Sequence, residues 1–242
     1  MTRLIVLAIA ICFLAIAAFS QPKSKIAQQA TATFPELGLV RIRVIETPTQ
    51  PIKLEFYSLR DKKTISSIEM ENSTLPDEPG PASSFLRFKV MTVPGQSQPL
   101  IFVVEVSPGG SDGTFFAHII GWKEGKFQIL NEESIETAVQ GGLYFGNLGK
   151  KYGYGVASWT FIWCSEVEPP EPNCREAHYD KYRYEIKLYP LDVKTMTFKE
   201  PVTFKTKRKY AGHGEAALKE FGFTFQDLRR SMGKVREYAD YQ

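Results

Sequence analysis

Apolar and polar side chains alternate with a period of two along most of this chain, and this alternation restricts the fold more than any other feature. It is clearest over residues 39–45, 52–57, 84–93 and 181–189. A period of two sends successive side chains to opposite faces of an extended backbone. These segments are therefore predicted to be strands with one face in water.

Three further runs, residues 100–106, 114–122 and 156–163, are apolar on both faces and are predicted to be central strands. Turn signals such as Pro94-Gly95 and Glu124-Gly125 separate the runs. Connections this short favour antiparallel pairing, because parallel strands need crossovers of a dozen or more residues.

No helical pattern of ten residues occurs before Thr206, which argues against a doubly wound α/β fold. Two short helices are predicted after it: residues 215–221, closed by Gly222, and a second helix capped by Thr224. We therefore predict a mainly β fold. It would be an antiparallel strand meander, either open and propeller-like or a two-sheet sandwich, with two short C-terminal helices.

The N-terminus has the pattern of a secretory signal peptide. Arg3 precedes an uncharged apolar run over residues 4–19, and Ala18 and Ser20 are small residues at the positions that a signal peptidase recognises. The run of 16 residues is shorter than the ~20 that span a bilayer. We expect cleavage after Ser20 and a secreted or periplasmic protein with no membrane association afterwards; an uncleaved signal anchor is the alternative.

The predicted organisation has four parts: a signal peptide over 1–20, a flexible linker over 21–38, an antiparallel β domain over 39–206 and a helical appendix over 207–242 packed on the β domain. The formal net charge is only +3, and no long run of one sign occurs. A nucleic-acid partner is therefore not expected.

Removal of the signal peptide leaves two cysteines, Cys164 and Cys174, with nine residues between them. In an oxidising compartment this pair is predicted to form a disulfide. Two cysteines alone make a poor zinc site, and no metal site is predicted. Asn72 begins an N-glycosylation sequon, which matters only in a host that glycosylates.

One stretch, Gly109–Gly113, matches the nucleophile-elbow pattern around Ser111, and Asp192 and His213 follow in the order of a hydrolase triad. An elbow runs into a helix, whereas residues 114–120 read as a strand. A serine esterase using Ser111 is therefore kept as an alternative, and we predict no catalytic residue and no cofactor.

Aromatic side chains in the glycine-rich stretch Gly141–Gly155 suggest a ligand-binding site. Tyr144, Tyr152 and Tyr154 are the predicted ligand-binding residues, since tyrosine offers a flat apolar face with a polar rim. The alternative is that these tyrosines pack on each other.

Trp159, Phe161 and Trp163, spaced by two, are predicted to be core. From these features we predict a non-catalytic ligand-binding or protein-interaction module. Its partner would be a carbohydrate, a peptide or an envelope protein. A structural domain of an envelope or matrix assembly is the alternative.

Phe145-Gly146 followed by Gly153–Ser158 resembles the FG-GAP and VCBS-type repeats of secreted β-propellers, and residues 84–132 resemble a similar strand meander. The resemblance implies a propeller-like arrangement of strands. The aspartate-rich calcium loop of those repeats is absent from this sequence.

Overall fold

A computed structural model describes residues 24–47, 50–70, 84–107, 114–138, 141–167, 181–212, 214 and 216–222. Several sequence-based predictions fall outside these residues: the signal peptide, Asn72, Ser111, Cys174, His213 and the second C-terminal helix.

The first sheet, sheet 1, is a four-stranded antiparallel meander of β1 (Lys25–Phe34), β2 (Gly38–Thr47), β3 (Gln50–Ser58) and β4 (Lys63–Glu69). Its apolar residues are buried on one face, as the period of two predicts. The opposite face carries polar side chains, including an Arg43–Glu55 ion pair of 3.0 Å between Nη1 and Oε1.

β1 lies where the sequence suggested a flexible linker, so the linker prediction is wrong for residues 25–34. Ala30, Ala32 and Phe34 alternate with Gln29, Thr31 and Thr33, and the first set faces the core beside β2. The alternation was present in the sequence, but small and polar residues gave it little hydrophobic contrast. Pairing with β2 supplies the stabilisation that these side chains alone do not.

The second sheet, sheet 2, contains β5 (Ser84–Met91), β6 (Leu100–Ser107), β7 (Thr114–Lys123), β8 (Lys126–Ile129) and β9 (Ile135–Ala138). The strand order is β5-β6-β7-β8, and β9 pairs with the first half of β7 while β8 pairs with its second half. The predicted Glu124-Gly125 turn joins β7 to β8, with φ values of 55° and 77°. Positive φ at both positions suits a two-residue hairpin.

The third sheet, sheet 3, contains β10 (Gly142–Asn147), β11 (Tyr154–Ile162), β12 (Arg183–Asp192), β13 (Thr197–Phe198) and β14 (Val202–Lys205). The order is β10-β11-β12-β13, and β14 pairs with the first part of β12. All strand pairs are antiparallel, as predicted.

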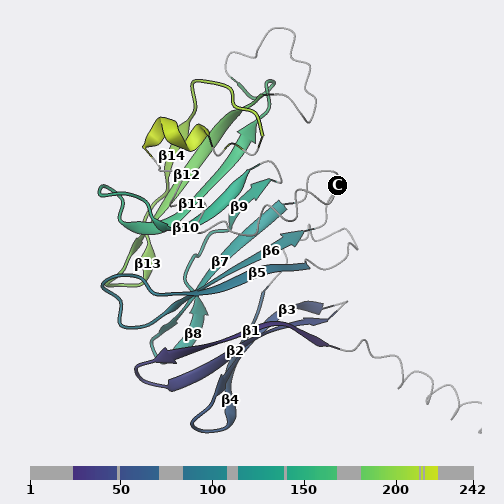
Figure 1. Ribbon diagram of the computed structural model, residues 1–242, viewed down its shortest axis with the longest axis vertical. Coiled ribbons are helices and arrows are strands. Elements are labelled where there is room, and N and C mark those ends of the chain that lie inside the picture. Colours follow the sequence, from purple (N-terminus) through teal and green to yellow (C-terminus); the bar gives the residue numbers. More distant parts are fainter. Residues whose placement is uncertain are drawn as a thin grey trace, which may run out of the picture.

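The three sheets are stacked face to face, with sheet 2 in the middle (Figure 1). One core lies between sheets 1 and 2 and a second between sheets 2 and 3. Ile101 and Val103 of β6 face the first core, and Leu100 and Phe102 face the second. Burial on both sides explains why β6 and β7 lack a polar face, and it shows that the two-sheet sandwich was the wrong alternative.

The outer face of sheet 3 is covered by η2 (Ala217–Phe221), a short 3-10 helix that packs on it through Ala217 and Leu218 (Figure 1). The prediction of two short C-terminal helices is therefore not borne out: the described part of residues 215–221 forms only this 3-10 turn of five residues, and the second helix lies outside the described residues. Gly214 and Gly222 both have a left-handed backbone, with φ of 70° and 81°. The helical stretch between them is too short for regular α-helical hydrogen bonding, so a single tight turn forms instead.

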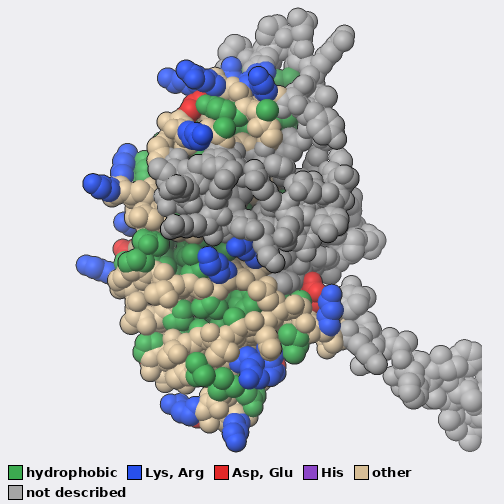
Figure 2. All heavy atoms as spheres, viewed as in Figure 1, with side chains coloured by type: hydrophobic (Ala, Val, Ile, Leu, Met, Phe, Trp, Pro, Cys, Tyr) green, Lys and Arg blue, Asp and Glu red, His purple; other side chains and the backbone are tan. Residues whose placement is uncertain are grey.

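Within the described residues no helix has the length and apolar character needed to cross a membrane. On the face shown in Figure 2, lysine and arginine side chains are scattered along the length of the stack rather than gathered in one patch.

Candidate functional site

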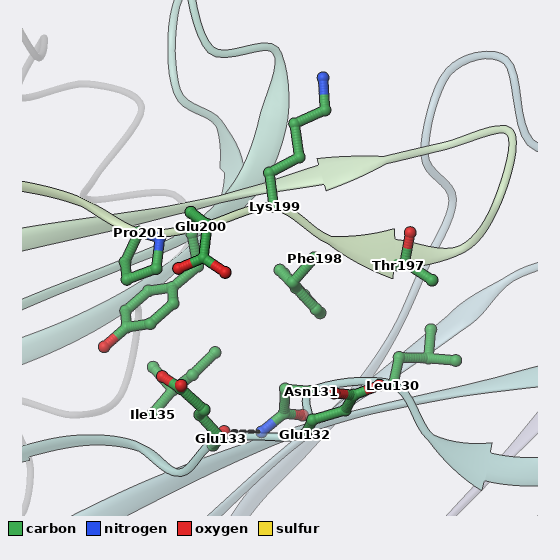
Figure 3. A pocket seen from close by; sticks show the side chains of 11 residues that line it. Leu130, Asn131, Glu132, Glu133, Ile135, Thr197, Phe198, Lys199, Glu200 and Pro201 are labelled. Carbon is green, nitrogen blue, oxygen red and sulfur yellow. Dashed lines mark hydrogen bonds between the residues drawn. The ribbon is translucent and has the colours of Figure 1, made fainter.

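A cavity of about 140 Å³ opens where sheets 2 and 3 meet. One wall is the connection from β8 to β9, residues 130–135, and the other is β13 with the loop that leads to β14, residues 197–201. Tyr189 of β12 completes the lining. Figure 3 labels the residues of the two walls. Two sheets far apart in the chain therefore build one site.

Asn131 holds the first wall in place. Its buried carboxamide accepts a hydrogen bond from the backbone N–H of Ile119 (2.8 Å) and donates to the carbonyls of Ala117 and Glu133 (3.1 Å each). These bonds replace strand pairing in the gap between β8 and β9, so the connection is tied to β7. A wall fixed by a fully bonded buried amide is rigid.

The second wall is fixed by the turn between β12 and β13. The Asp192 carboxylate accepts hydrogen bonds from the backbone N–H groups of Lys194 and Thr195, at 2.9 and 3.3 Å, and these bonds lower the pKa of Asp192. The backbone N–H of Lys199 then donates to the Pro190 carbonyl at 2.8 Å. The loop that carries Glu200 is thereby anchored to the edge of sheet 3.

Charge at the mouth of the cavity is mainly negative. Glu132 and Glu133 come from the first wall and Glu200 from the second, against a single cation, Lys199. Figure 3 shows the carboxylates of Glu133 and Glu200 directed toward one another from opposite walls, whereas Lys199 extends away from the cavity.

Apolar side chains form the floor of the cavity, although most of its exposed lining is polar. Leu130, Ile135 and Tyr189 are buried, and Phe198 is half-buried and points inward (Figure 3). Burial is the main cause that raises the pKa of Tyr189, so its hydroxyl is protonated at neutral pH. The site thus combines a small apolar floor with a polar, carboxylate-rich rim, and it suits a group that has a short apolar stem and a cationic end.

The predicted ligand-binding tyrosines do not converge on this cavity or on one another. Tyr144 is buried on the η2 side of sheet 3, where its hydroxyl donates to the Asn147 carbonyl at 3.3 Å. Tyr152 is half-buried on the same side, edge-on to Phe204 with 6.3 Å between ring centroids. Tyr154 packs instead against the core between sheets 2 and 3.

The interpretation of the aromatic strand as core is confirmed for Trp159 and Phe161, which are 0% and 9% exposed. Trp163 is half-buried at the end of the same row, in edge contact with Phe161 at 4.7 Å between ring centroids.

Cys164 directly follows Trp163 in the sequence and is buried. Its predicted partner Cys174 lies outside the described residues, so the disulfide stays a prediction.

The residues of the alternative hydrolase triad are only partly described. The segment after Ser111 is strand β7, whereas a nucleophile elbow would lead into a helix. Asp192 uses its carboxylate to cap its own turn. Neither observation favours a triad.

His118 is the histidine whose environment the structure describes. Its Nε2 atom lies 2.8 Å from Oε1 of Glu105, which is 1% exposed. His118 is therefore a partly buried strand histidine that has a hydrogen-bond partner. In the described part of the chain, no group of three or more His, Cys, Asp and Glu side chains is placed to hold a metal ion.

Sequence reasoning missed the cavity because its residues come from two loops some sixty positions apart. The signal that could have suggested it is local: Asn131-Glu132-Glu133 and Lys199-Glu200-Pro201 each follow a short strand and carry exposed acids. Nothing in the sequence shows that the two loops face each other.

Comparison of the chain with protein-family models, with curated proteins and with solved structures finds no match. The fold and the cavity therefore carry the functional argument by themselves.

Proposed function

We propose that this chain is a secreted or periplasmic, non-catalytic interaction module, and that the cavity between sheets 2 and 3 receives one basic side chain of a protein partner. The observation that carries the proposal is the cavity itself: an apolar floor between two fixed walls, with Glu133 and Glu200 facing each other at a polar mouth.

Size favours a single side chain over a whole small molecule. Pockets for drug-sized ligands measure roughly 300–1,000 Å³. A cavity of about 140 Å³ is well below that range. It has room for an anchor residue, and anchor residues seated in small pockets supply much of the affinity of protein interfaces.

Charge favours lysine or arginine as the anchor. The aliphatic stem of either residue would pack between Phe198 and Ile135, while the cationic end would lie between the two facing carboxylates. The planar guanidinium of arginine can bind two carboxylates at once, so arginine is expected to bind more tightly than lysine.

The test is a titration of the protein with short glycine-flanked peptides that carry a central arginine, lysine or glutamate. Changes in the backbone NMR shifts of the protein report binding. We expect the arginine and lysine peptides to shift signals of residues 130–135 and 197–201, and the glutamate peptide to shift none. Glu133→Gln/Glu200→Gln should weaken arginine-peptide binding at least about tenfold, since charge-assisted bonds are the strong ones.

The control is Glu69→Gln/Glu124→Gln, which makes the same change in net charge at exposed positions on sheets 1 and 2. This variant should bind the arginine peptide as the wild type does. Equal weakening in both variants would indicate nonspecific electrostatic attraction and would contradict the proposal, as would shifts that avoid both walls.

A second proposal concerns architecture: the stack is an open, propeller-like series of blades. Its support is the repeated strand order, since β1-β2-β3-β4, β5-β6-β7-β8 and β10-β11-β12-β13 are each four consecutive strands in sequence order. Closed propellers have at least about four such blades around a channel, and three stacked meanders match an open version of that plan. An experimental structure in which the three sheets do not share this order would refute it.

A further inference from the structure

The face of sheet 3 that carries Tyr189 continues along β12 as a polar surface. Tyr189 faces the core between sheets 2 and 3, whereas Ile186 and Leu188 face η2. Because successive side chains of a strand alternate between its faces, Glu185 and Lys187 share the face of Tyr189. β11 and β14 flank β12 on either side, and the residues paired with these two point the same way (Figure 1). We call this surface the polar strip, and its members are Ser158, Thr160, Glu185, Lys187, Thr203 and Lys205.

The polar strip begins where the cavity ends, at Tyr189. Burial is the largest cause of the raised pKa of Tyr189, but polar neighbours act on its hydroxyl as well. The Lys187 charge and a hydrogen bond with the Ser158 side chain lower the pKa, whereas the charges of Glu133 and Glu136 raise it. Tyr189 therefore lies at the boundary between the acidic mouth of the cavity and the polar strip.

The lysines of the strip outnumber its carboxylates. Nζ of Lys187 lies 3.4 Å from Oε1 of Glu185, and Nζ of Lys205 lies 3.7 Å from Oε2 of the same side chain. Each ammonium group has three N–H donors, so one contact leaves donors over. The two lysine side chains are 44% and 64% exposed, and Thr203, which pairs with Lys187, is exposed as well. A second carboxylate can therefore reach both ammonium groups from solvent.

Spacing along β12 relates the two lysines to the cavity. Strands rise about 3.3 Å per residue, so the Cα atoms of Lys187 and Tyr189 are about 7 Å apart. An extended partner segment has the same rise, and its side chains two positions apart point to the same side. When the basic anchor enters the cavity beside Tyr189 and the segment follows β12, the side chain two positions away comes over Lys187.

We propose that the partner binds as an extended segment with an acidic residue two positions from its basic anchor, and that Lys187 and Lys205 bind this acidic residue. The inference rests on the proposed function, because the cavity has to hold the anchor. It narrows the partner from any basic segment to one of mixed charge. A polybasic segment would place a second cation over the two lysines. A segment with its charges exchanged would place the acidic residue beside Glu133 and Glu200, so the two surfaces also set the register.

NMR titration with five glycine-flanked peptides tests the inference. One peptide carries arginine alone, two carry glutamate two positions before or after the arginine, and two carry lysine at those positions. Both orders are needed because the segment can run either way along β12. We expect one glutamate peptide to bind about three- to tenfold more tightly than the arginine-only peptide, since each exposed ion pair adds a modest amount. Lysine at the same position should weaken binding.

Three variants assign the effect to the two lysines. Lys187→Gln/Lys205→Gln should bind the glutamate peptide no more tightly than the arginine-only peptide. Lys187→Glu/Lys205→Glu reverses the charge and should prefer the lysine peptide to the glutamate peptide. Lys63→Gln/Lys126→Gln makes the same change in net charge as the first variant, at exposed positions on sheets 1 and 2, and should keep the wild-type preference for glutamate.

The titrations separate failure of this inference from failure of the proposed function. An arginine-only peptide that shifts no signals of residues 130–135 and 197–201 would refute both. Binding of that peptide with no gain from glutamate in either order would overturn the inference alone. A gain that persists in Lys187→Gln/Lys205→Gln, or that is lost equally in Lys63→Gln/Lys126→Gln, would overturn it too. So would tighter binding of the lysine peptides by the wild type.

Discussion

His118 and Glu105 form a hydrogen-bonded pair across β7 and β6, with 2.8 Å between Nε2 of the imidazole and Oε1 of the carboxylate. The side chain of Glu105 is 1% exposed, and its second oxygen, Oε2, has no hydrogen-bond partner. A carboxylate buried to this degree depends on its one polar neighbour, because an unpaired buried charge is expensive.

His118→Ala is therefore expected to lower the free energy of unfolding by about 1–3 kcal/mol, the usual cost of leaving a buried polar group without its hydrogen-bond partner. His118→Ala/Glu105→Leu should recover much of that loss, because it removes the stranded carboxylate as well. Urea unfolding at neutral pH measures both values. A double variant no more stable than His118→Ala would show that the loss came from packing and not from the carboxylate.

Gly214 approaches the ring of Tyr184 closely enough that a side chain cannot be added. A Cβ atom there would lie 2.3 Å from Cε1 of Tyr184, and the backbone has φ of +70°. Gly212 has a similar φ of +73°, yet a Cβ atom there would meet nothing within 4 Å. The two positions differ in contact and not in backbone conformation.

Gly212→Ala should accordingly cost about 1–2 kcal/mol from the left-handed backbone alone. Gly214→Ala should cost about 1–3 kcal/mol more than that, because the ring of Tyr184 has to move. Thermal unfolding of the two variants compares them directly. Equal losses of stability in the two variants would indicate that the backbone before η2 shifts and relieves the contact with Tyr184 without strain.

Tyr184 links stability to alkaline pH. Burial, with a smaller effect of Tyr182, raises the pKa of Tyr184 well above its ordinary value of 10.0. The folded protein then keeps a proton that the unfolded chain releases near pH 10. The free energy of unfolding is at its full value below that pH and decreases as the pH rises above it.

Tyr184→Phe should reduce this alkaline decrease by the contribution of one proton. Well below pH 10 it should cost about 1 kcal/mol, because it removes the 2.6 Å hydrogen bond from the hydroxyl to the Gly212 carbonyl. Urea unfolding across the alkaline range measures the slope. If the free energy of unfolding decreases with pH equally in the wild type and in Tyr184→Phe, another group causes the alkaline decrease.

The predicted Cys164–Cys174 disulfide has a direct test in intact mass, which should rise by two hydrogens on reduction. Cys164→Ser should lower the free energy of unfolding by about 2–3 kcal/mol, the usual range for closure of a short loop. Cys174→Ser should have the same effect, since either substitution opens the same loop. Two free thiols in the oxidised preparation would contradict the prediction.

The strands could be predicted where hydrophobic contrast is strong. β2, β3, β5 and β12 follow the alternation of Val, Ile, Leu and Phe with charged residues, and β6 and β7 follow from unbroken apolar runs. β1 was missed because alanine and threonine give a weak contrast, although the period is the same. The composition of residues 215–221 predicts a short helix, whereas the structure has a single 3-10 turn there, between two left-handed glycines.

The sequence by itself determined the strand-rich class, the antiparallel pairing and the burial of Trp159, because each depends on neighbours within a few residues along the chain. Tertiary structure alone decided that there are three sheets and not two, since that depends on which apolar faces meet. It also decided that Glu133 and Glu200 face each other across one cavity and that Tyr144 and Tyr154 do not. Side-chain direction relative to a distant segment follows from the packing of whole sheets, and no local pattern encodes it.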